Sequence, residues 1–283
     1  MARTDTLSIE LQATGKDKLA EEYGKVIENI QHITLANVLK NTDLSGDPTA
    51  GSVEATRFVN AKSQAYGTAR GAGKGNVLKT KRVTVNIDDN TEYIEEVEEK
   101  DLRMYGVNGL IERRTRNHQN MLAVDLDTKF FDVAKTAGSQ FTPDEANTDI
   151  ADEIEEAIQN VEVIKNDYVK GVPRNMINVI MTPAYYGKLR NKINSIPNSN
   201  NLGVVPNYEA GIFNNTRVYS SVFLPAGIDY LVMVDGAVAQ PVMTSIYEPK
   251  KIELSDATGM GMFVYKGTKA VTEDLIFYKN TAV

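Results

Sequence analysis

The chain has 283 residues, enough for one large domain or two modest ones, and its 42% hydrophobic and 24% charged residues are typical of globular proteins. Its 38 acidic and 31 basic residues give a net charge of -7, which disfavours binding of nucleic acid by the surface as a whole, although a locally basic face remains open. The absence of cysteine excludes disulfides and thiolate metal sites, and no segment has the roughly 18 apolar residues of a membrane span.

The first part of the chain predicts a helix followed by a long hairpin. Apolar residues recur at three- and four-residue steps over residues 17–39, and a polar loop follows over 41–51. An outgoing run over 54–68, a glycine-rich tip over 70–76 and a return run over 77–87 then predict an extended hairpin. Few residues of its outgoing run are strongly apolar, so this hairpin needs an outside surface to lie on.

Two longer helices are predicted next. Residues 101–137 form one long helix, with an interruption expected around residues 106–109 and Gly138 as its C-terminal cap. Residues 149–164 form an amphipathic helix whose acidic side, which includes Glu153, is expected to face solvent. The apolar face of the long helix includes Leu122, Leu126, Phe130 and Val133, with His118 one turn earlier.

The last part of the chain is mixed. Residues 178–181 predict a short buried strand, and Thr182 and Pro183 have the form of a helix start before a helix over 185–193. A polar loop is predicted over 194–207. Short strands are predicted at 217–221, 230–234, 251–254, 261–266 and 274–278.

The glycine-rich tip, Gly71 to Gly75, is the one segment that invites a phosphate-loop interpretation. A phosphate loop needs glycine where Thr68 stands and Ser or Thr where Gly75 stands, and a dinucleotide fingerprint needs a further glycine and a following helix. The segment is therefore interpreted as a hairpin tip.

Clusters of carboxylates and the two histidines are the remaining candidates for chemistry. The acids occur as Asp88/Asp89, Glu95/Glu96, Glu98/Glu99, Asp125/Asp127 and the run from Asp149 to Glu156, without the spacing of a calcium loop. His32 and His118 fall in different predicted helices, and no serine elbow is present. We therefore predict no catalytic residue, no cofactor site and no metal site, and we do not expect an enzyme.

The best local basic patch is on the long helix. Arg113, Arg114, Arg116 and Lys129 could contact a nucleic-acid-filled interior, or they could pair with acids of the same or neighbouring subunits. The second interpretation is favoured because the chain has more acids than bases.

The order of these elements resembles that of the major capsid proteins of tailed bacteriophages, which share the Hong Kong 97 type fold. The similar pieces are the return strand at 81–88 leading to residues 93–102, the segment 121–127 in the long helix, and the strand–proline–helix step at 178–190. The segments at 211–220 and 221–225 and the closing strands up to Tyr278 complete the resemblance.

The resemblance implies an α+β fold of five parts. These are an N-terminal arm over residues 1–51, an extended loop over 52–100, a spine helix of the peripheral domain over 101–139, an axial domain over 140–245, and return strands of the peripheral domain over 246–283.

The function implied by the resemblance is self-assembly into pentamers and hexamers of an icosahedral phage head around double-stranded DNA. The partners would then be many copies of the same chain, a portal, scaffolding or decoration proteins, and DNA held by weak non-specific contact, with no membrane. Assembly would take place in the cytoplasm of a bacterial host, and the protein would reside in the virion. The alternative is the shell protein of an encapsulin-like nanocompartment that packages cargo enzymes.

Overall fold

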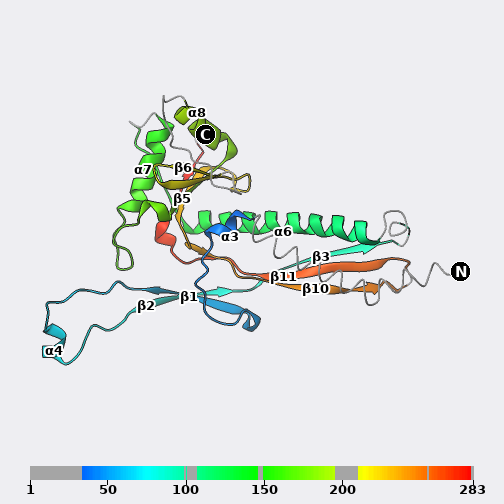
Figure 1. Cartoon of the computed structure of the whole chain (residues 1–283), viewed down its shortest axis with the longest axis horizontal. Helices are drawn as coiled ribbons and strands as arrows, with labels where there is room; N and C mark the ends of the chain where they lie inside the picture. Colours follow the sequence, from blue (N-terminus) through cyan, green and yellow to red (C-terminus); the bar gives the residue numbers. More distant parts are fainter. Residues whose placement is uncertain are drawn as a thin grey trace. The chain divides into compact units, whose positions relative to one another are not determined.

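A computed structural model describes residues 34–98, 100, 107–145, 149–194, 210–253 and 255–281. These residues divide into two compact units, each formed by segments that are distant in the sequence (Figure 1). The first unit takes its described residues from 34–38, 86–129 and 241–267, and the second takes them from 39–85, 130–240 and 268–281. The predicted five-part division remains a prediction.

The first unit is a three-stranded antiparallel sheet in the order β10-β11-β3, with helix α6 along one face (Figure 1). The strands are β3 (Asp89–Val97), β10 (Val242–Lys251) and β11 (Thr258–Lys266), and the helix is α6 (Val107–Ala137), whose residues up to Lys129 belong to this unit. Side chains alternate along β3, so Asp89, Tyr93 and Glu95 face α6 while Glu92 and Ile94 point away from it.

Ion pairs and ring contacts join α6 to this sheet. Arg114 pairs with Glu95, and Lys129 Nζ lies 3.6 Å from an Asp89 carboxylate oxygen. The buried Lys266 of β11 pairs with Asp125 of α6. Gly261 is required in β11 because a Cβ atom there would collide with the Tyr93 carbonyl of the neighbouring strand.

The second unit has a six-stranded mixed sheet in the order β4-β13-β8-β5-β7-β6. Strands β5 and β7 run parallel, as do β4 and β13, and the other pairs are antiparallel. The bounds are β4 (Ser139–Gln140), β5 (Ile177–Met181), β6 (Ala210–Phe213), β7 (Thr216–Ser220), β8 (Ile228–Val234) and β13 (Ile276–Asn280).

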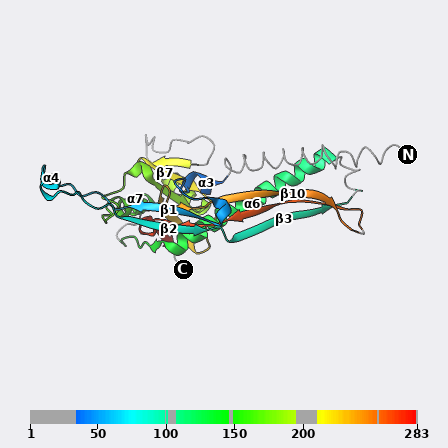
Figure 2. The ribbon, with the colours of Figure 1, turned by 90° about the horizontal axis from the view of Figure 1, so that it is seen from below.

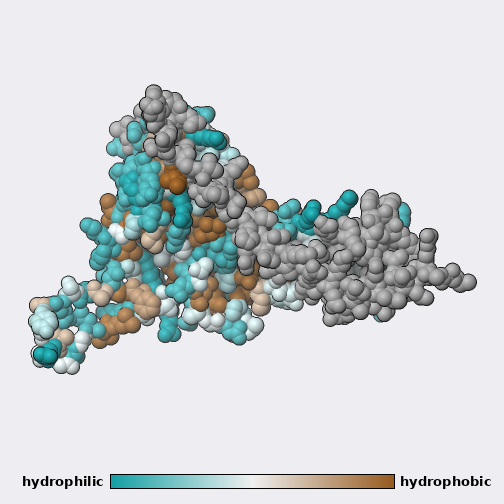
Figure 3. Space-filling model, viewed as in Figure 1, coloured by the Kyte–Doolittle hydropathy of each residue, from teal (hydrophilic) through white to brown (hydrophobic). Residues whose placement is uncertain are grey.

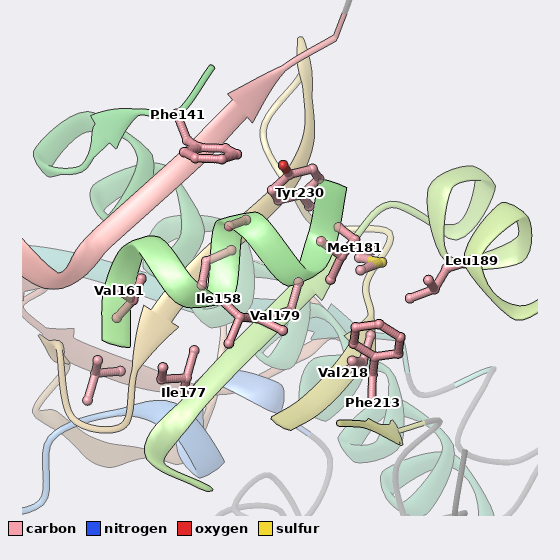
Figure 4. Packing of buried hydrophobic residues seen from close by; sticks show 14 of the residues in the cluster. Phe141, Ile158, Val161, Ile177, Val179, Met181, Leu189, Phe213, Val218 and Tyr230 are labelled. Atoms are coloured by element: carbon pink, nitrogen blue, oxygen red, sulfur yellow. The ribbon is translucent and has the colours of Figure 1, made fainter. Parts of the chain in front are cut away.

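Helices α7 (Ile150–Glu162) and α8 (Pro183–Asn194) pack on this sheet around the largest described core (Figure 4). Ile158 and Val161 of α7 meet Val179 of the all-buried strand β5, and Leu189 closes the core from α8. The side chain of Asp149 accepts a hydrogen bond from the Ala151 N–H, which fixes the first residue of α7.

The extended hairpin is formed by β1 (Ser52–Phe58), the short helix α4 (Thr68–Ala72) at its far end, and β2 (Thr80–Asn86) (Figures 1 and 2). The remaining short elements are α3 (Leu35–Leu39), β9 (Val238–Ala239), β12 (Lys269–Ala270), and 3-10 turns at Pro48–Ala50, Arg174–Met176 and Glu273–Leu275. Strands β9 and β12 pair with each other.

Several predicted elements agree with the structure. The amphipathic helix, the buried strand and the helix beginning at Pro183 are confirmed as α7, β5 and α8. The first predicted helix is confirmed only for the residues of α3, because residues 1–33 lie outside the described residues. Residues 195–207 of the predicted polar loop lie outside them as well.

Other predictions are wrong in detail. The outgoing strand of the hairpin ends at Phe58 rather than Thr68, and residues 89–97, for which no strand was predicted, form β3 of the first unit before the long helix. The described part of the long helix passes through Gly109 without interruption. Gly138 directly follows α6 and donates its N–H to the Ala134 carbonyl, as the predicted cap expects, but its backbone is not left-handed. Glycine is needed there because a Cβ atom would lie 2.8 Å from the Ile276 side chain.

The strand predicted at 251–254 is also wrong. The ten-residue strand β10 ends at Lys251, and the Ser255 N–H bonds to the Ile252 carbonyl in the turn that follows. Pro249 explains the error, because proline cannot donate to a strand ladder and therefore argues against a strand. In the structure, the register of β10 shifts between Tyr247 and Lys250, and β10 is an edge strand of the described sheet.

Candidate functional site

The extended hairpin is the part of the described chain that lacks a core of its own. Every side chain from Asn60 to Arg82 is exposed, and the large apolar ones are included: Tyr66 is fully exposed, Val77 is 83% exposed and Leu78 is 71% exposed. Apolar surface along the hairpin behind its tip is seen in Figure 3. A two-stranded hairpin in water is marginally stable at best, so this surface is suited to burial against another molecule.

The base of the hairpin, in contrast, is held by a small apolar cluster. Val53 and Ala55 of β1 and Val85 of β2 are buried together with Ala239 and Val271. The hairpin therefore begins from a fixed position in the second unit.

A half-buried arginine joins β1 to the same unit. Arg57 donates two hydrogen bonds to the two carboxylate oxygens of Asp274, at 2.5 and 2.8 Å, and Asn166 donates a third at 2.5 Å. The guanidinium also lies 4.3 Å from the centre of the Tyr168 ring. Burial alone would raise the pKa of Asp274, but the hydrogen bonds and charge of Arg57 lower it, so the pair stays ionised.

The tip is shaped by local hydrogen bonds and glycines. Asn76 donates to the Lys62 carbonyl at 3.1 Å and accepts from Gln64, which joins the two sides of the hairpin. Gly67 and Gly73 flank α4 in left-handed backbone conformations that favour glycine. The segment Gly71 to Gly75 thus forms the end of a one-turn helix and its cap.

The predicted basic patch on α6 is divided between paired and exposed side chains. Arg114 pairs with Glu95, and Lys129 pairs with Asp89 of the same chain, as the favoured interpretation expects; pairing with neighbouring subunits stays a prediction. Arg113 and Arg116 are exposed, and each takes part in an interaction. The hydrogen bond from Arg114 is the main reason why the pKa of Glu95 is lowered.

His118 is buried, with 2% of its surface exposed. Its Nε2 atom lies 3.3 Å from Glu95 and its ring centre lies 5.8 Å from that of Tyr93. It packs between the helix and the sheet of the first unit, and no group of three metal-ligating side chains is found among the described residues.

Glu153 was predicted on the solvent side of its helix, and this is wrong. It is 8% exposed, accepts a hydrogen bond from Tyr185 at 2.7 Å and pairs with Lys279 at 2.8 Å. Burial, and then the bond to Glu153, raises the pKa of Tyr185 well above its usual range. Lys279 comes from β13, 126 residues away, and so no local pattern indicates this network.

A second carboxylate of α7 is also part of a network. Arg174 pairs with Glu155 and with Glu162, the latter at 2.9 Å, and Asn214 donates to Glu155 at 3.0 Å. The hydrogen bond from Arg174 is the main reason why the pKa of Glu155 is lowered to about 2. Glu153, Glu155 and Glu162 of α7 therefore bind side chains from other elements and stabilise the fold of the second unit.

No family model matches the sequence, and no curated protein matches it. Solved structures do match. The capsid of the cyanophage P-SCSP1u is 16% identical over 88% of this chain and 88% of that chain, with a TM-score of 0.60. The capsid of Ralstonia phage GP4 is 14% identical over 82% and 84%, with a TM-score of 0.59.

A virus-like particle from Pyrococcus furiosus is 10% identical over 92% of this chain and 98% of that chain, with a TM-score of 0.55. The matches extend over most of both chains, and they confirm the predicted fold class: this chain has the α+β fold of tailed-phage capsid proteins.

Within the part of the chain that the structure describes, no helix is long and apolar enough to cross a membrane.

Proposed function

We propose that this chain is the major capsid protein of a tailed phage and that it assembles from many copies into an icosahedral shell. The similarity of fold to solved phage capsids supports a structural role. The observation that carries the proposal is the extended hairpin, whose side chains from Asn60 to Arg82 are all exposed. Its apolar surface becomes stable when it is buried against a second copy.

The finer parts of the proposal concern the shell and its contents. The copies form pentamers and hexamers, the shell encloses double-stranded DNA held by weak non-specific contact, and a portal with scaffolding or decoration proteins completes it. Assembly takes place in the bacterial cytoplasm, and the protein has no catalytic role. The polar loop over 194–207 lies near the five- and six-fold axes in this proposal.

Deletion of Ala65 to Asn76 tests the role of the hairpin. The deletion removes the exposed tip and leaves the apolar cluster at the base intact, so the monomer folds but assembles poorly. Negative-stain microscopy and sedimentation of wild type and variant measure the yield of particles, and circular dichroism checks the fold of the variant. A normal yield from the deletion variant would contradict the proposal.

The same particles separate the proposal from its alternative. A phage shell contains or admits DNA, whereas a nanocompartment shell contains cargo proteins and no DNA. Nuclease-protected DNA and co-purifying proteins in particles made in the native host decide between the two.

A further inference from the structure

A fully buried lysine lies between α6 and the sheet of the first unit. Lys266, at the end of β11, has none of its surface exposed, and its Nζ atom contacts Oδ2 of Asp125 on α6. Both atoms are buried, and neither has a hydrogen-bond partner in the described part of the chain. Burial of two charges without hydrogen bonds is costly, so an ion pair is an unfavourable final state for these two groups.

The surroundings of the Lys266 amine are apolar. Met262, Val264 and Lys266 alternate along β11 and are each at most 1% exposed, so they share the buried face of the strand. Leu122, one turn before Asp125 on α6, is buried as well. Burial lowers the pKa of Lys266, and the charge of Asp89 opposes this effect. The lysine therefore gives up its proton more readily than an exposed lysine, and the neutral amine is a nucleophile.

A second carboxylate lies beside this amine. Asp89 of β3 is the residue directly opposite Lys266 in the strand register, and directly opposite side chains lie on the same face of a sheet. The Asp89 carboxylate also lies 3.6 Å from Nζ of Lys129, whose side chain is half exposed. The first unit thus brings together an amine, a carboxyl group in contact with it and a neighbouring proton acceptor.

Another lysine–aspartate pair of the chain shows what is different about this one. Lys192 Nζ lies 2.5 Å from Asp149 Oδ2 in the second unit, but the lysine side chain is 44% exposed. The hydrogen bond to Asp149 raises the pKa of Lys192, so this amine stays protonated. Contact with an aspartate is therefore not sufficient to make a lysine reactive, and burial is what distinguishes Lys266.

We propose that Lys266 and Asp125 form an intramolecular isopeptide bond, which links β11 covalently to α6. The Lys266 ammonium passes a proton to the Asp89 carboxylate, and the lone pair of the resulting amine attacks Cγ of Asp125. A C–N bond forms and one C–O bond of Asp125 breaks. The oxygen leaves as water with the proton from Asp89 and one further proton from the amine.

The reaction balances without any co-reactant. One ammonium and one carboxylate become one amide and one water, nothing is oxidised or reduced, and Asp89 ends as it began. The Asp125 side chain is 31% exposed, which leaves the water a way out to solvent. The bond forms once in each chain and keeps α6 on its sheet, because a covalent link restricts the unfolded chain. It does not depend on assembly.

Mass spectrometry of the intact, denatured full-length chain tests the bond. The wild type is lighter than its sequence by the mass of one water, and its tryptic digest contains a branched peptide that joins the segments of Asp125 and Lys266. Lys266→Arg keeps the positive charge but cannot form this amide, so it has the full mass of its sequence. Asp125→Asn releases ammonia in place of water, and its product therefore has the same mass as the wild-type product.

Two further variants test the role of burial and the proton acceptor. Lys192→Arg is the matched control at the exposed pair, and it keeps the loss of water. Asp89→Asn removes the proton acceptor, and the bond forms about a hundredfold more slowly in freshly made protein. Circular dichroism establishes that each variant is folded.

The possible outcomes are distinct. A wild-type chain with the full mass of its sequence overturns the inference, as does a loss of water that persists in Lys266→Arg. A loss of water without the branched peptide would show a succinimide at an aspartate instead, and it overturns the inference too. None of these results bears on the proposed function, which is tested by the formation of particles.

Discussion

Asp127 shows how a buried charge is used at the scale of a single residue. It is 5% exposed on α6 and accepts hydrogen bonds from the backbone N–H groups of Leu35, at 3.2 Å, and Ala36, at 2.8 Å. These groups lie at the start of α3, about ninety residues earlier in the chain. The carboxylate thus fixes the position at which the N-terminal segment joins the first unit.

Burial raises the pKa of Asp127 to about 6. The two backbone hydrogen bonds lower this pKa, but by less than burial raises it. The pKa of Asp127 in the folded chain lies above its unfolded value of 3.8. Between pH 3.8 and about pH 6, the folded chain therefore keeps a proton on this carboxyl that the unfolded chain loses. The stability that this residue contributes is therefore full below about pH 4 and is lost as the pH rises through about 6.

The predicted loss is about 3 kcal/mol between pH 4 and pH 7, from about 1.4 kcal/mol per unit of pKa shift. Asp127→Asn removes the titration and keeps one oxygen for the backbone N–H groups. Urea unfolding of the unassembled wild type and variant at both pH values measures the change. The free energy of unfolding of the wild type should fall relative to that of Asp127→Asn as the pH rises. A constant difference between the two proteins would show that Asp127 does not titrate in this range.

At the scale of elements, the base of the extended hairpin depends on Arg57. Lysine at this position keeps the charge but cannot donate two parallel hydrogen bonds to Asp274. Arg57→Lys should therefore loosen the base, and amide hydrogen exchange in β1 and β2 should become about tenfold faster, as expected for the loss of about 1.4 kcal/mol from local opening. Hydrogen-exchange mass spectrometry of the unassembled chain measures this.

Arg82→Lys is the control for Arg57→Lys. Arg82 lies 3.6 Å from Glu54, with 70% of its side chain exposed, and exposed pairs of this kind contribute little to stability. Exchange in β1 and β2 should change little. Equal effects of the two substitutions would mean that the bidentate pair between Arg57 and Asp274 does not hold the hairpin base.

The elements that were predicted correctly are those with a strong local pattern. The four buried apolar residues of α7 recur along one face of its helix, and Thr182-Pro183 marks the start of α8. Strand β10 was missed because Pro249 argues against a strand, and the structure accommodates it with a bulge. Local patterns cannot show partners that are distant in the sequence, and this is why the burial of Glu153 against Lys279 was not predicted.

Only part of the candidate site could be predicted, because again only local patterns are visible in the sequence. The exposed hairpin could be inferred from its few apolar residues, but α4 at its tip could not, since a five-residue helix with two glycines at its ends has no periodic pattern.

At the scale of the whole molecule, charge and apolar contact have different roles in the proposed shell. With a net charge of -7, cohesion of the shell and retention of DNA cannot depend on a protein that is basic overall. Exposed ion pairs contribute roughly 0–1 kcal/mol each, whereas burial of apolar surface contributes about 25 cal/mol per Å². In the proposed shell, exposed ion pairs therefore adjust assembly, and buried apolar contacts hold the copies together.

High salt separates these two roles. At 1 M salt the Debye length falls to about 3 Å, which weakens exposed ion pairs and leaves apolar contacts intact. Assembled, emptied particles should therefore persist when the salt is raised to 1 M, while assembly from subunits at the same salt should start more slowly. Light scattering follows assembly, and sedimentation with negative-stain microscopy follows the particles. Dissociation of preformed particles at 1 M salt would show that ion pairs, and not buried apolar surface, hold the shell together.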